Sequence, residues 1–306
     1  MLKEILDVLP SELSNKINNV GANSGINEIR LRISRNVIVI SSNTEVVLNY
    51  IVSLKDLLDI LVNISKNSIY AIQNDINNGF VTICGGHRIG ICGEVVIQDG
   101  KIKNIKNINS MNIRVARQII GCADKIMPYI ITNSKFNNTL IISPPGCGKT
   151  TLLRDAIRQL SNGVEILNFK GKNVGVIDER GEIAAINNGK YNLDVGVRTD
   201  VMSNCPKSIG IEMLIRSMGI DIIATDEIGS KNDIDAIKHA SLSGVKLIFT
   251  AHGTNINEIS QKEGLSYLVN NNFFDTLIVL SNKNGPGTIE KIHKIEKTNE
   301  FKKEVI

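Results

Sequence analysis

Short apolar runs in the second half of the chain alternate with stretches of helical spacing. These runs are rich in β-branched residues, and they lie at residues 139–142, 174–177, 220–225, 245–250 and 276–280. Continuous apolar strands separated by helices are typical of a parallel sheet whose two faces are both covered. We therefore predict that residues 139–306 form one α/β domain, in which a ligand binds at the carboxyl ends of the strands.

The first third of the chain mixes helical and strand patterns on a smaller scale. Residues 2–20 have amphipathic helical spacing that is interrupted near Pro10, and residues 54–67 have a second helical pattern. Alternating positions, and one glycine-rich turn, predict strands or paired strands at residues 28–34, 36–40 and 80–97. We therefore predict a small mixed α/β domain over residues 1–110.

Between these two regions the chain becomes polar and rich in Asn and Lys. This polar stretch at residues 101–110 leads into helical spacing that continues towards Tyr129. Clusters of polar residues between periodic segments are typical of connections. We therefore interpret residues 111–138 as a linker with a connecting helix.

Composition narrows the class of protein. The 306 residues are enough for two domains, and 42% hydrophobic with 22% charged residues is ordinary for a globular protein. The net charge of +4 is too small to indicate a nucleic-acid partner. The 5 cysteines include no CxxC pair, which disfavours a zinc site and a disulfide framework. No apolar run reaches the roughly 18 residues of a membrane span, so we expect a cytoplasmic protein.

A glycine-containing segment follows the first apolar run and precedes a helical pattern. From residue 143 to residue 150 it reads Ser-Pro-Pro-Gly-Cys-Gly-Lys-Thr. The P-loop pattern begins with Gly, where this chain has Ser143, but its Gly-Lys-Thr end is intact. Backbone N–H groups at a helix N-terminus still favour a phosphate there. We predict a Walker A loop that binds ATP, with Lys149 at the β- and γ-phosphates and Thr150 at Mg²⁺. The residues assigned to nucleotide binding are Ser143, Pro144, Pro145, Gly146, Cys147, Gly148, Lys149, Thr150 and Thr151.

Two acidic residues follow the apolar run at 220–225. Asp226 stands where a Walker B aspartate helps to hold Mg²⁺. Glu227 comes next, and it could orient and polarise the water that attacks the γ-phosphate. The alternative is a pair of solvated acids at a strand end, but the P-loop favours an ATPase.

Four further groups are candidates for the site, and one of them, Arg216, lies on a predicted helix just before the run at 220–225. His252 follows the run at 245–250 and could contact the γ-phosphate, or it could be structural. Arg216 and Arg198 could each act as an arginine finger, in cis or from a neighbouring subunit, or form structural ion pairs. The acids around Arg180 could position water or metal, or pair with arginines.

Taken in order, these motifs resemble those of one family. The segments SPPGCGKTTLLRD, VIDERGEIAA, GVRTDV, CPK, LIRSMGIDIIATDEIG and FTAHG are similar to the stage III sporulation protein AA family of endospore-forming Firmicutes. In the first third, EIRLRIS, GFVTICGGHRIGICGEV and SMNIRVAR match the same family. The resemblance therefore covers most of the chain.

The resemblance implies a fold, a reaction and partners. The family is similar to the traffic ATPases of type II and type IV secretion systems, which are hexameric rings. It therefore implies a RecA-like P-loop core, a homo-oligomeric ring, and docking to membrane proteins of a channel complex between mother cell and forespore. Asp178, Glu179 and Glu182 lie where those ATPases have an acidic box, although Arg180 and Gly181 depart from the usual box. His252 lies where they have a histidine box.

We expect Mg²⁺-dependent ATP hydrolysis in the mother-cell cytoplasm. The catalytic residues expected are Glu227, Lys149, His252 and Arg216, and the metal ligands expected are Thr150 and Asp226. Two alternatives share the core fold: a nucleotide-dependent scaffold or switch with little turnover, and a nucleic-acid motor. The motor would need a basic groove, which the charge distribution does not indicate. A small-molecule kinase is a more distant alternative.

Overall fold

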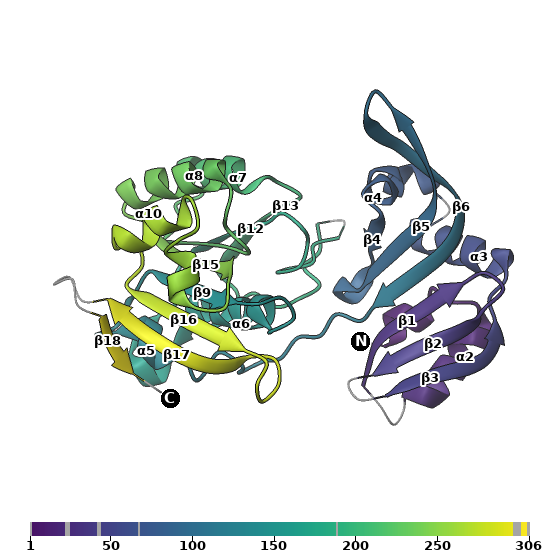
Figure 1. Cartoon of the computed structure of the whole chain (residues 1–306), viewed down its shortest axis with the longest axis horizontal. Coiled ribbons are helices and arrows are strands. Elements are labelled where there is room, and N and C mark those ends of the chain that lie inside the picture. Colours follow the sequence, from purple (N-terminus) through teal and green to yellow (C-terminus); the bar gives the residue numbers. More distant parts are fainter. Residues whose placement is uncertain are drawn as a thin grey trace. The chain divides into compact units, whose positions relative to one another are not determined.

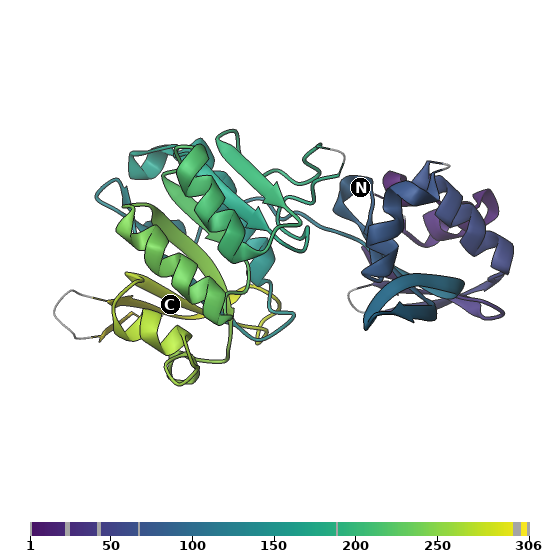
Figure 2. The same cartoon turned by 90° about the horizontal axis from the view of Figure 1, so that it is seen from above.

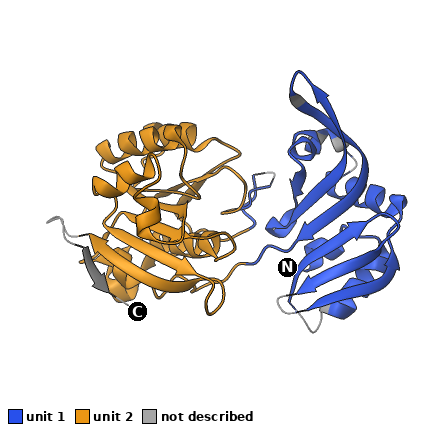
Figure 3. Cartoon of the chain, viewed as in Figure 1, with its two compact units in different colours: residues 1–117, 185–192 blue, residues 118–184, 193–306 orange. Residues whose placement is uncertain are grey.

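The chain divides into two compact units (Figure 3). The structure is a computed structural model, and it describes residues 2–21, 25–41, 44–66, 68–187, 189–295 and 301–304. Unit 1 consists of residues 1–117 and 185–192, and unit 2 consists of residues 118–184 and 193–306. The chain therefore leaves unit 2 after Ala184, contributes a short segment to unit 1, and returns to unit 2 at Leu193.

Unit 1 contains an antiparallel sheet with helices packed on it (Figure 1). Among the described residues its strands follow the order β3-β2-β1-β6-β5-β4. The strands are β1 (Ile26–Arg32), β2 (Asn36–Ser41), β3 (Glu45–Ile51), β4 (Phe80–Thr82), β5 (Arg88–Gln98) and β6 (Lys101–Arg114). The helices are α1 (Lys3–Leu6), α2 (Ser11–Gly21), α3 (Leu54–Ser65) and α4 (Gln73–Asn77), with the 3₁₀ helices η1 (Ile69–Ile72) and η2 (Cys84–Gly86).

The helices and strands predicted between residues 2 and 97 are confirmed, and β3 is an addition to them. The core of the unit joins Leu13 of α2 and Leu57 of α3 to Ile29 and Ile113 of the sheet, all fully buried. Burial of these apolar side chains, at roughly 1.5–3 kcal/mol each, is the main force that holds the helices on the sheet.

The predicted linker is wrong in its first part. Residues 111–114 are the end of β6, in which buried Met111 and Ile113 alternate with more exposed neighbours. The polar residues before them pair with β5 in a long hairpin, so their polarity marks solvated strand faces and not a connection. Residues 118–138 belong to unit 2 and hold no long connecting helix. Their elements are α5 (Met127–Ile130), β7 (Ile131–Thr132) and β8 (Lys135–Phe136).

Unit 2 contains a mainly parallel sheet with helices on both faces (Figures 1 and 2). Within the described part of the chain its strand order is β13-β12-β14-β15-β9-β16-β17-β18. The large strands are β9 (Thr139–Ser143), β12 (Val174–Asp178), β13 (Thr199–Ser203), β14 (Ile222–Thr225), β15 (Lys246–His252), β16 (Thr276–Ser281), β17 (Thr288–Ile295) and β18 (Phe301–Glu304), and a hairpin adds β10 (Gly163–Val164) and β11 (Phe169–Lys170). The helices are α6 (Lys149–Asn162), α7 (Lys207–Ser217), α8 (Lys231–Leu242), α9 (Ile256–Ile259) and α10 (Leu265–Asn270), with the 3₁₀ helix η3 (Glu165–Leu167).

The five predicted strand runs are confirmed, and their carboxyl ends place Lys149, Asp226, Glu227 and His252 at one edge. Strands β13, β12, β14, β15, β9 and β16 are parallel, while β17 and β18 add antiparallel strands that the sequence did not indicate. Leu140 and Ile142 of β9 pack in one core with Ile237 of α8 and Leu268 of α10. Ile141, between them, points to the opposite face, on which α6 lies. The loops after β9, β12, β14 and β15 therefore meet at the carboxyl edge of the sheet.

No helix among the described residues is long and apolar enough to cross a membrane.

Candidate nucleotide-binding site

The loop between β9 and α6 has the backbone that a phosphate-binding turn requires. Gly146 and Gly148 have φ angles of 73° and 81°, a left-handed conformation that favours glycine. A Cβ atom on Gly148 would also lie 3.1 Å from the backbone nitrogen of Gly287, in the β16–β17 loop. The backbone N–H of Gly287 donates a hydrogen bond of 2.9 Å to the carbonyl of buried Cys147. The β16–β17 loop therefore supports the glycine loop from one side.

Lys149 closes this loop with its own side chain. Its Nζ atom donates hydrogen bonds to the carbonyl oxygens of Ser143, at 2.9 Å, and Pro144, at 3.2 Å. Burial lowers the pKa of Lys149, and the negative charges of Glu227 and Asp226 oppose that shift. An ammonium held by weak carbonyl acceptors can exchange them for phosphate oxygens, which bind it more strongly.

Asp226 follows β14 as the sequence predicted, and it is almost fully buried, with 4% of its surface exposed. Its Oδ1 atom has no hydrogen-bond partner among the described residues. Burial raises the pKa of Asp226 to about 6, against the opposing charge of Lys207. A buried carboxylate oxygen that accepts no hydrogen bond is costly, and a carboxylate oxygen is the hard ligand that Mg²⁺ prefers. Asp226 therefore fits a metal ligand, together with the hydroxyl of half-buried Thr150.

Glu227 is held in an unusual backbone conformation. Its φ angle is 27°, which is rare for a residue with a side chain. Its N–H donates a hydrogen bond of 2.8 Å to Oγ1 of Thr250 on β15. Its carboxylate accepts a hydrogen bond of 3.4 Å from Arg180, and its side chain remains 44% exposed. Strained residues persist where their surroundings fix them, and they cluster at functional sites.

A polar cavity of about 400 Å³ lies beside Glu227. Polar and charged side chains line it: Glu179 and Arg180 after β12, Lys207 at the start of α7, Glu227 after β14, His252 at the end of β15, and Lys262 after α9. His252 is exposed at the end of β15, opposite Ser143 of β9 in the sheet register. The structure therefore brings Glu227 and His252 to one cavity, as the sequence predicted.

The loop after β12 places its acids in different roles. Asp178 is fully buried, and its carboxylate accepts hydrogen bonds from the backbone N–H groups of Glu182, Ile183 and Ala184 at 2.8–3.1 Å. Arg154 of α6 donates to the carbonyls of Ile183 and Glu182. Asp178 thus shapes the loop and ties it to the helix that follows the glycine loop. It does not offer its oxygens to a ligand.

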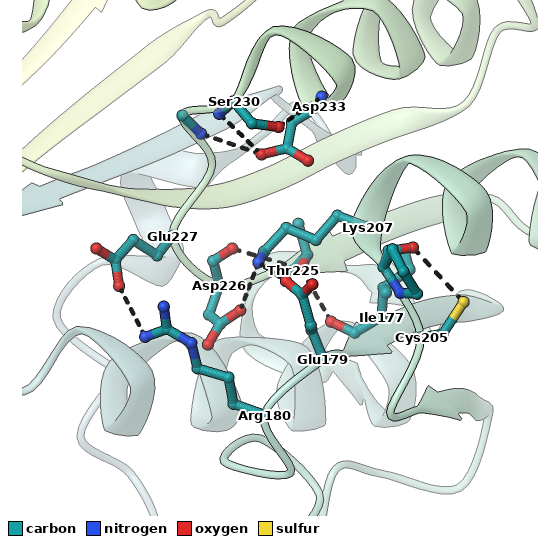
Figure 4. Close-up of polar contacts among 12 residues, drawn as sticks. Ile177, Glu179, Arg180, Cys205, Lys207, Thr225, Asp226, Glu227, Ser230 and Asp233 are labelled. Atoms are coloured by element: carbon teal, nitrogen blue, oxygen red, sulfur yellow. Dashed lines mark hydrogen bonds and ion pairs between the residues drawn. The ribbon is translucent and has the colours of Figure 1, made fainter. Parts of the chain in front are cut away.

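Glu179 and Asp226 share a buried lysine that sequence reasoning missed (Figure 4). Lys207, the first residue of α7, is 6% exposed, and its ammonium bonds Glu179 and lies 3.7 Å from Oδ1 of Asp226. The sequence signal was the family-like segment Cys205-Pro206-Lys207, to which no role was assigned, and nothing local to it indicates partners in other loops.

The two candidate arginines lie away from this cluster. Arg216 is exposed in the last turn of α7, at the opposite end of the helix from Lys207, and pairs with Glu212. Arg198 donates to the backbone carbonyl of Ser161, at 2.9 Å, in a structural contact. The structure therefore brings neither arginine to Asp226 within one chain.

The family comparison covers nearly the whole chain. The family model described as "Sporulation stage III, protein AA" matches residues 2–299. The chain is also 40% identical, over 294 residues, to stage III sporulation protein AA of Bacillus subtilis (strain 168), and the alignment covers 95% of each protein. The chain belongs to the stage III sporulation protein AA family.

Solved structures of an ATPase and of a pilus retraction motor share this fold. The ATPase DotB of Legionella pneumophila matches with a TM-score of 0.59 and 14% identity, over 94% of this chain and 82% of that one. The pilus retraction motor PilT, solved with bound ADP, matches with a TM-score of 0.57 and 15% identity, over 86% and 76%. At this identity the likeness is one of fold, and it confirms the predicted α/β architecture.

Proposed function

We propose that this member of the family is a Mg²⁺-dependent ATPase. The observation that carries the proposal is the buried oxygen of Asp226, which accepts no hydrogen bond from any described residue, at the same sheet edge as the glycine loop and Lys149. The fold shared with the ATPase DotB and with PilT, which was solved with bound ADP, supports it. In this proposal residues 143–151 form the Walker A loop, and Asp226 and Glu227 form the Walker B pair.

Each residue then has a definite task. Lys149 exchanges the carbonyls of Ser143 and Pro144 for phosphate oxygens, and the N–H groups of the loop surround the phosphate. Thr150 and Asp226 would hold Mg²⁺, which neutralises charge on the phosphates when bound. Glu227 orients and polarises the attacking water, and its fixed backbone keeps the carboxylate in one direction. His252 contacts the γ-phosphate side of the cavity.

The biological role that we propose follows the family. The ATPase energises assembly of, or transport through, the channel complex between mother cell and forespore, docked on its membrane proteins from the mother-cell cytoplasm. It works as a homo-oligomeric ring, for which a hexamer is the expected size, and binds no nucleic acid. Arg216 is exposed and far from its own Asp226, so in this proposal a neighbouring subunit receives it.

Two measurements test the proposed reaction: binding of an ADP analogue and release of phosphate from ATP. A fluorescent ADP analogue titrated with Mg²⁺ should bind the wild type, should bind Lys149→Ala at least about 100-fold more weakly, and should bind Glu227→Gln normally. Glu227→Gln should release no phosphate from ATP. The exposed residues Lys135 and Glu165 supply matched controls, Lys135→Ala and Glu165→Gln, which should leave both measurements unchanged. Absence of ADP binding by the wild type refutes the proposal, and phosphate release by Glu227→Gln removes the role of Glu227.

Light scattering tests the ring and the role of Arg216. The chain should form an oligomer in the presence of a non-hydrolysable ATP analogue. Arg216→Ala should keep nucleotide binding and lose most turnover. A strict monomer both with and without the analogue contradicts the ring and leaves the active site without an arginine from a neighbour.

A further inference from the structure

Lys207 occupies a position that helix stability does not explain. It is the first residue of α7, where the positive end of the helix dipole opposes a cation. It is also 6% exposed, and lysine is almost never buried unless it is paired. Pro206 before it and the close packing of α7 hold it in place. A Cβ atom on Gly210, one turn further on, would lie 2.8 Å from the side chain of Ile177 on β12.

The partners of Lys207 come from the two strands beside it. Glu179 follows β12 and Asp226 follows β14, and these strands are parallel neighbours. The ammonium donates to the carboxylate of Glu179, whose side chain is 39% exposed. Its distance of 3.7 Å from Oδ1 of Asp226 is that of an ion pair without a hydrogen bond. Figure 4 shows the lysine between the two acids. Lys207 therefore supplies charge to Asp226 while it leaves the lone pairs of Oδ1 free.

We propose that Lys207 is a built-in counter-ion of Asp226 that excludes a divalent cation from this carboxylate until nucleotide is bound. This inference rests on the proposed function, because it concerns the same metal ligand. A positive charge this close to Asp226 opposes a second cation, and Lys149 adds another positive charge at the same edge. The phosphates of a nucleotide offset both charges, so the metal enters together with its nucleotide.

Glu179 keeps the buried ammonium of Lys207 paired when Asp226 binds a metal. When Asp226 turns to a metal, the ammonium keeps its hydrogen bond to Glu179 and is not left buried and unpaired. Lys207 is thus a positioning residue that acts through Asp226 and does not itself touch the nucleotide.

Binding of Mn²⁺ to the nucleotide-free protein, measured by electron paramagnetic resonance, tests the inference on the full chain. Lys207→Met should bind Mn²⁺ at least about tenfold more tightly than the wild type, because one opposing charge is gone. Lys207→Arg should behave like the wild type. Lys231→Met is the matched control, since Lys231 is the exposed first residue of the neighbouring helix α8. The double variant Lys207→Met/Asp226→Asn should lose the gain.

Three outcomes overturn the inference. Mn²⁺ affinity of Lys207→Met at or below the wild-type value is the first, and a gain that survives Asp226→Asn is the second. The third is a gain in Mn²⁺ affinity that is just as large with saturating ADP. With ADP we expect the affinities of Lys207→Met and the wild type to differ by less than about threefold, because the phosphates offset the positive charge of Lys207. Circular dichroism checks the fold, and Lys207→Gln replaces Lys207→Met in the same comparison if the latter does not fold.

The two proposals fail in different ways. If the wild type binds no ADP with Mg²⁺, the proposed function fails whatever the Mn²⁺ titration gives. If the wild type binds ADP and Lys207→Met binds Mn²⁺ no more tightly, only the role of Lys207 fails.

Discussion

The backbone N–H of Glu227 donates a 2.8 Å hydrogen bond to the hydroxyl of Thr250, which joins the end of β14 to the neighbouring strand. Thr250 is 1% exposed, so its hydroxyl has a fixed place within the sheet. The φ angle of 27° at Glu227 has a conformational cost that this bond helps to offset. The direction of the Glu227 carboxylate therefore depends on a hydroxyl of the next strand.

Thr250→Val should impair turnover without impairing nucleotide binding. The substitution keeps the shape of the side chain and removes the acceptor, so the N–H of Glu227 loses its partner at about 1 kcal/mol of stability. We expect kcat to fall about tenfold while the Kd for ADP stays unchanged, since only the direction of Glu227 is loosened. Thr250→Ser retains the hydroxyl and should restore most of kcat. A Thr250→Val enzyme with normal kcat would show that this hydrogen bond does not control the carboxylate.

Asp226→Asn should stabilise the metal-free protein at neutral pH. Burial raises the pKa of Asp226 to about 6 from 3.8, so the folded state binds the proton more tightly than the unfolded state does. The ionised carboxylate therefore costs stability above pH 6, by up to about 3 kcal/mol, and this cost disappears as the pH falls towards 4.

Thermal unfolding in EDTA measures this effect. The Tm of Asp226→Asn should exceed that of the wild type at pH 7.5, and the gap should close between pH 7 and pH 4. Asp7→Asn, at an exposed acid of unit 1, should show no comparable gap. A Tm of Asp226→Asn below the wild-type value at pH 7.5 contradicts the prediction.

Gly148→Ala should abolish nucleotide binding, and Gly244→Ala should not. Both glycines have φ near 80°, where a side chain costs about 1–2 kcal/mol. Only Gly148 also has a backbone atom, the nitrogen of Gly287, within 3.1 Å of the added Cβ. Gly244 has open space around it and serves as the control for the conformational cost. Equal loss of ADP affinity in the two variants, or in neither, would refute a specific requirement at Gly148.

Asp178→Asn should lower stability more than it changes metal affinity. The Asp178 carboxylate accepts three backbone N–H groups, and an amide nitrogen turned towards any of them would face a donor. We expect a loss of about 2–4 kcal/mol in the free energy of unfolding, measured with urea. Affinity for Mg²⁺ with ADP should change less than threefold in the folded variant. A much larger loss of metal affinity at normal stability would make Asp178 a ligand.

Local patterns predicted the sheet of unit 2 because its strands are buried on both faces and form continuous apolar runs. The same reasoning failed at β6, where solvated faces of a long hairpin give a polar stretch that resembles a linker. Sequence patterns placed Asp226 and Glu227 correctly because both residues directly follow a strand, whose end lies at the carboxyl edge of the sheet. They missed Lys207, whose two partners come from other loops, since no short-range pattern marks such a pairing.

The assignment of residues 185–192 also lay beyond sequence patterns. Asn187 donates its side-chain amide to the carbonyl of Thr82, and Asn192 accepts the N–H of Gly85. These bonds span more than 100 positions of the chain. Side-chain amides are common in loops, so nothing in their local sequence indicates this distant partner.

This excursion of the chain has a genetic consequence. A gene fragment that stops at codon 117 would encode unit 1 without the asparagines that bond Thr82 and Gly85. Neither unit is encoded by one continuous stretch of the gene, so a single gene fragment that encodes all of unit 1 also has to encode residues 118–184 of unit 2.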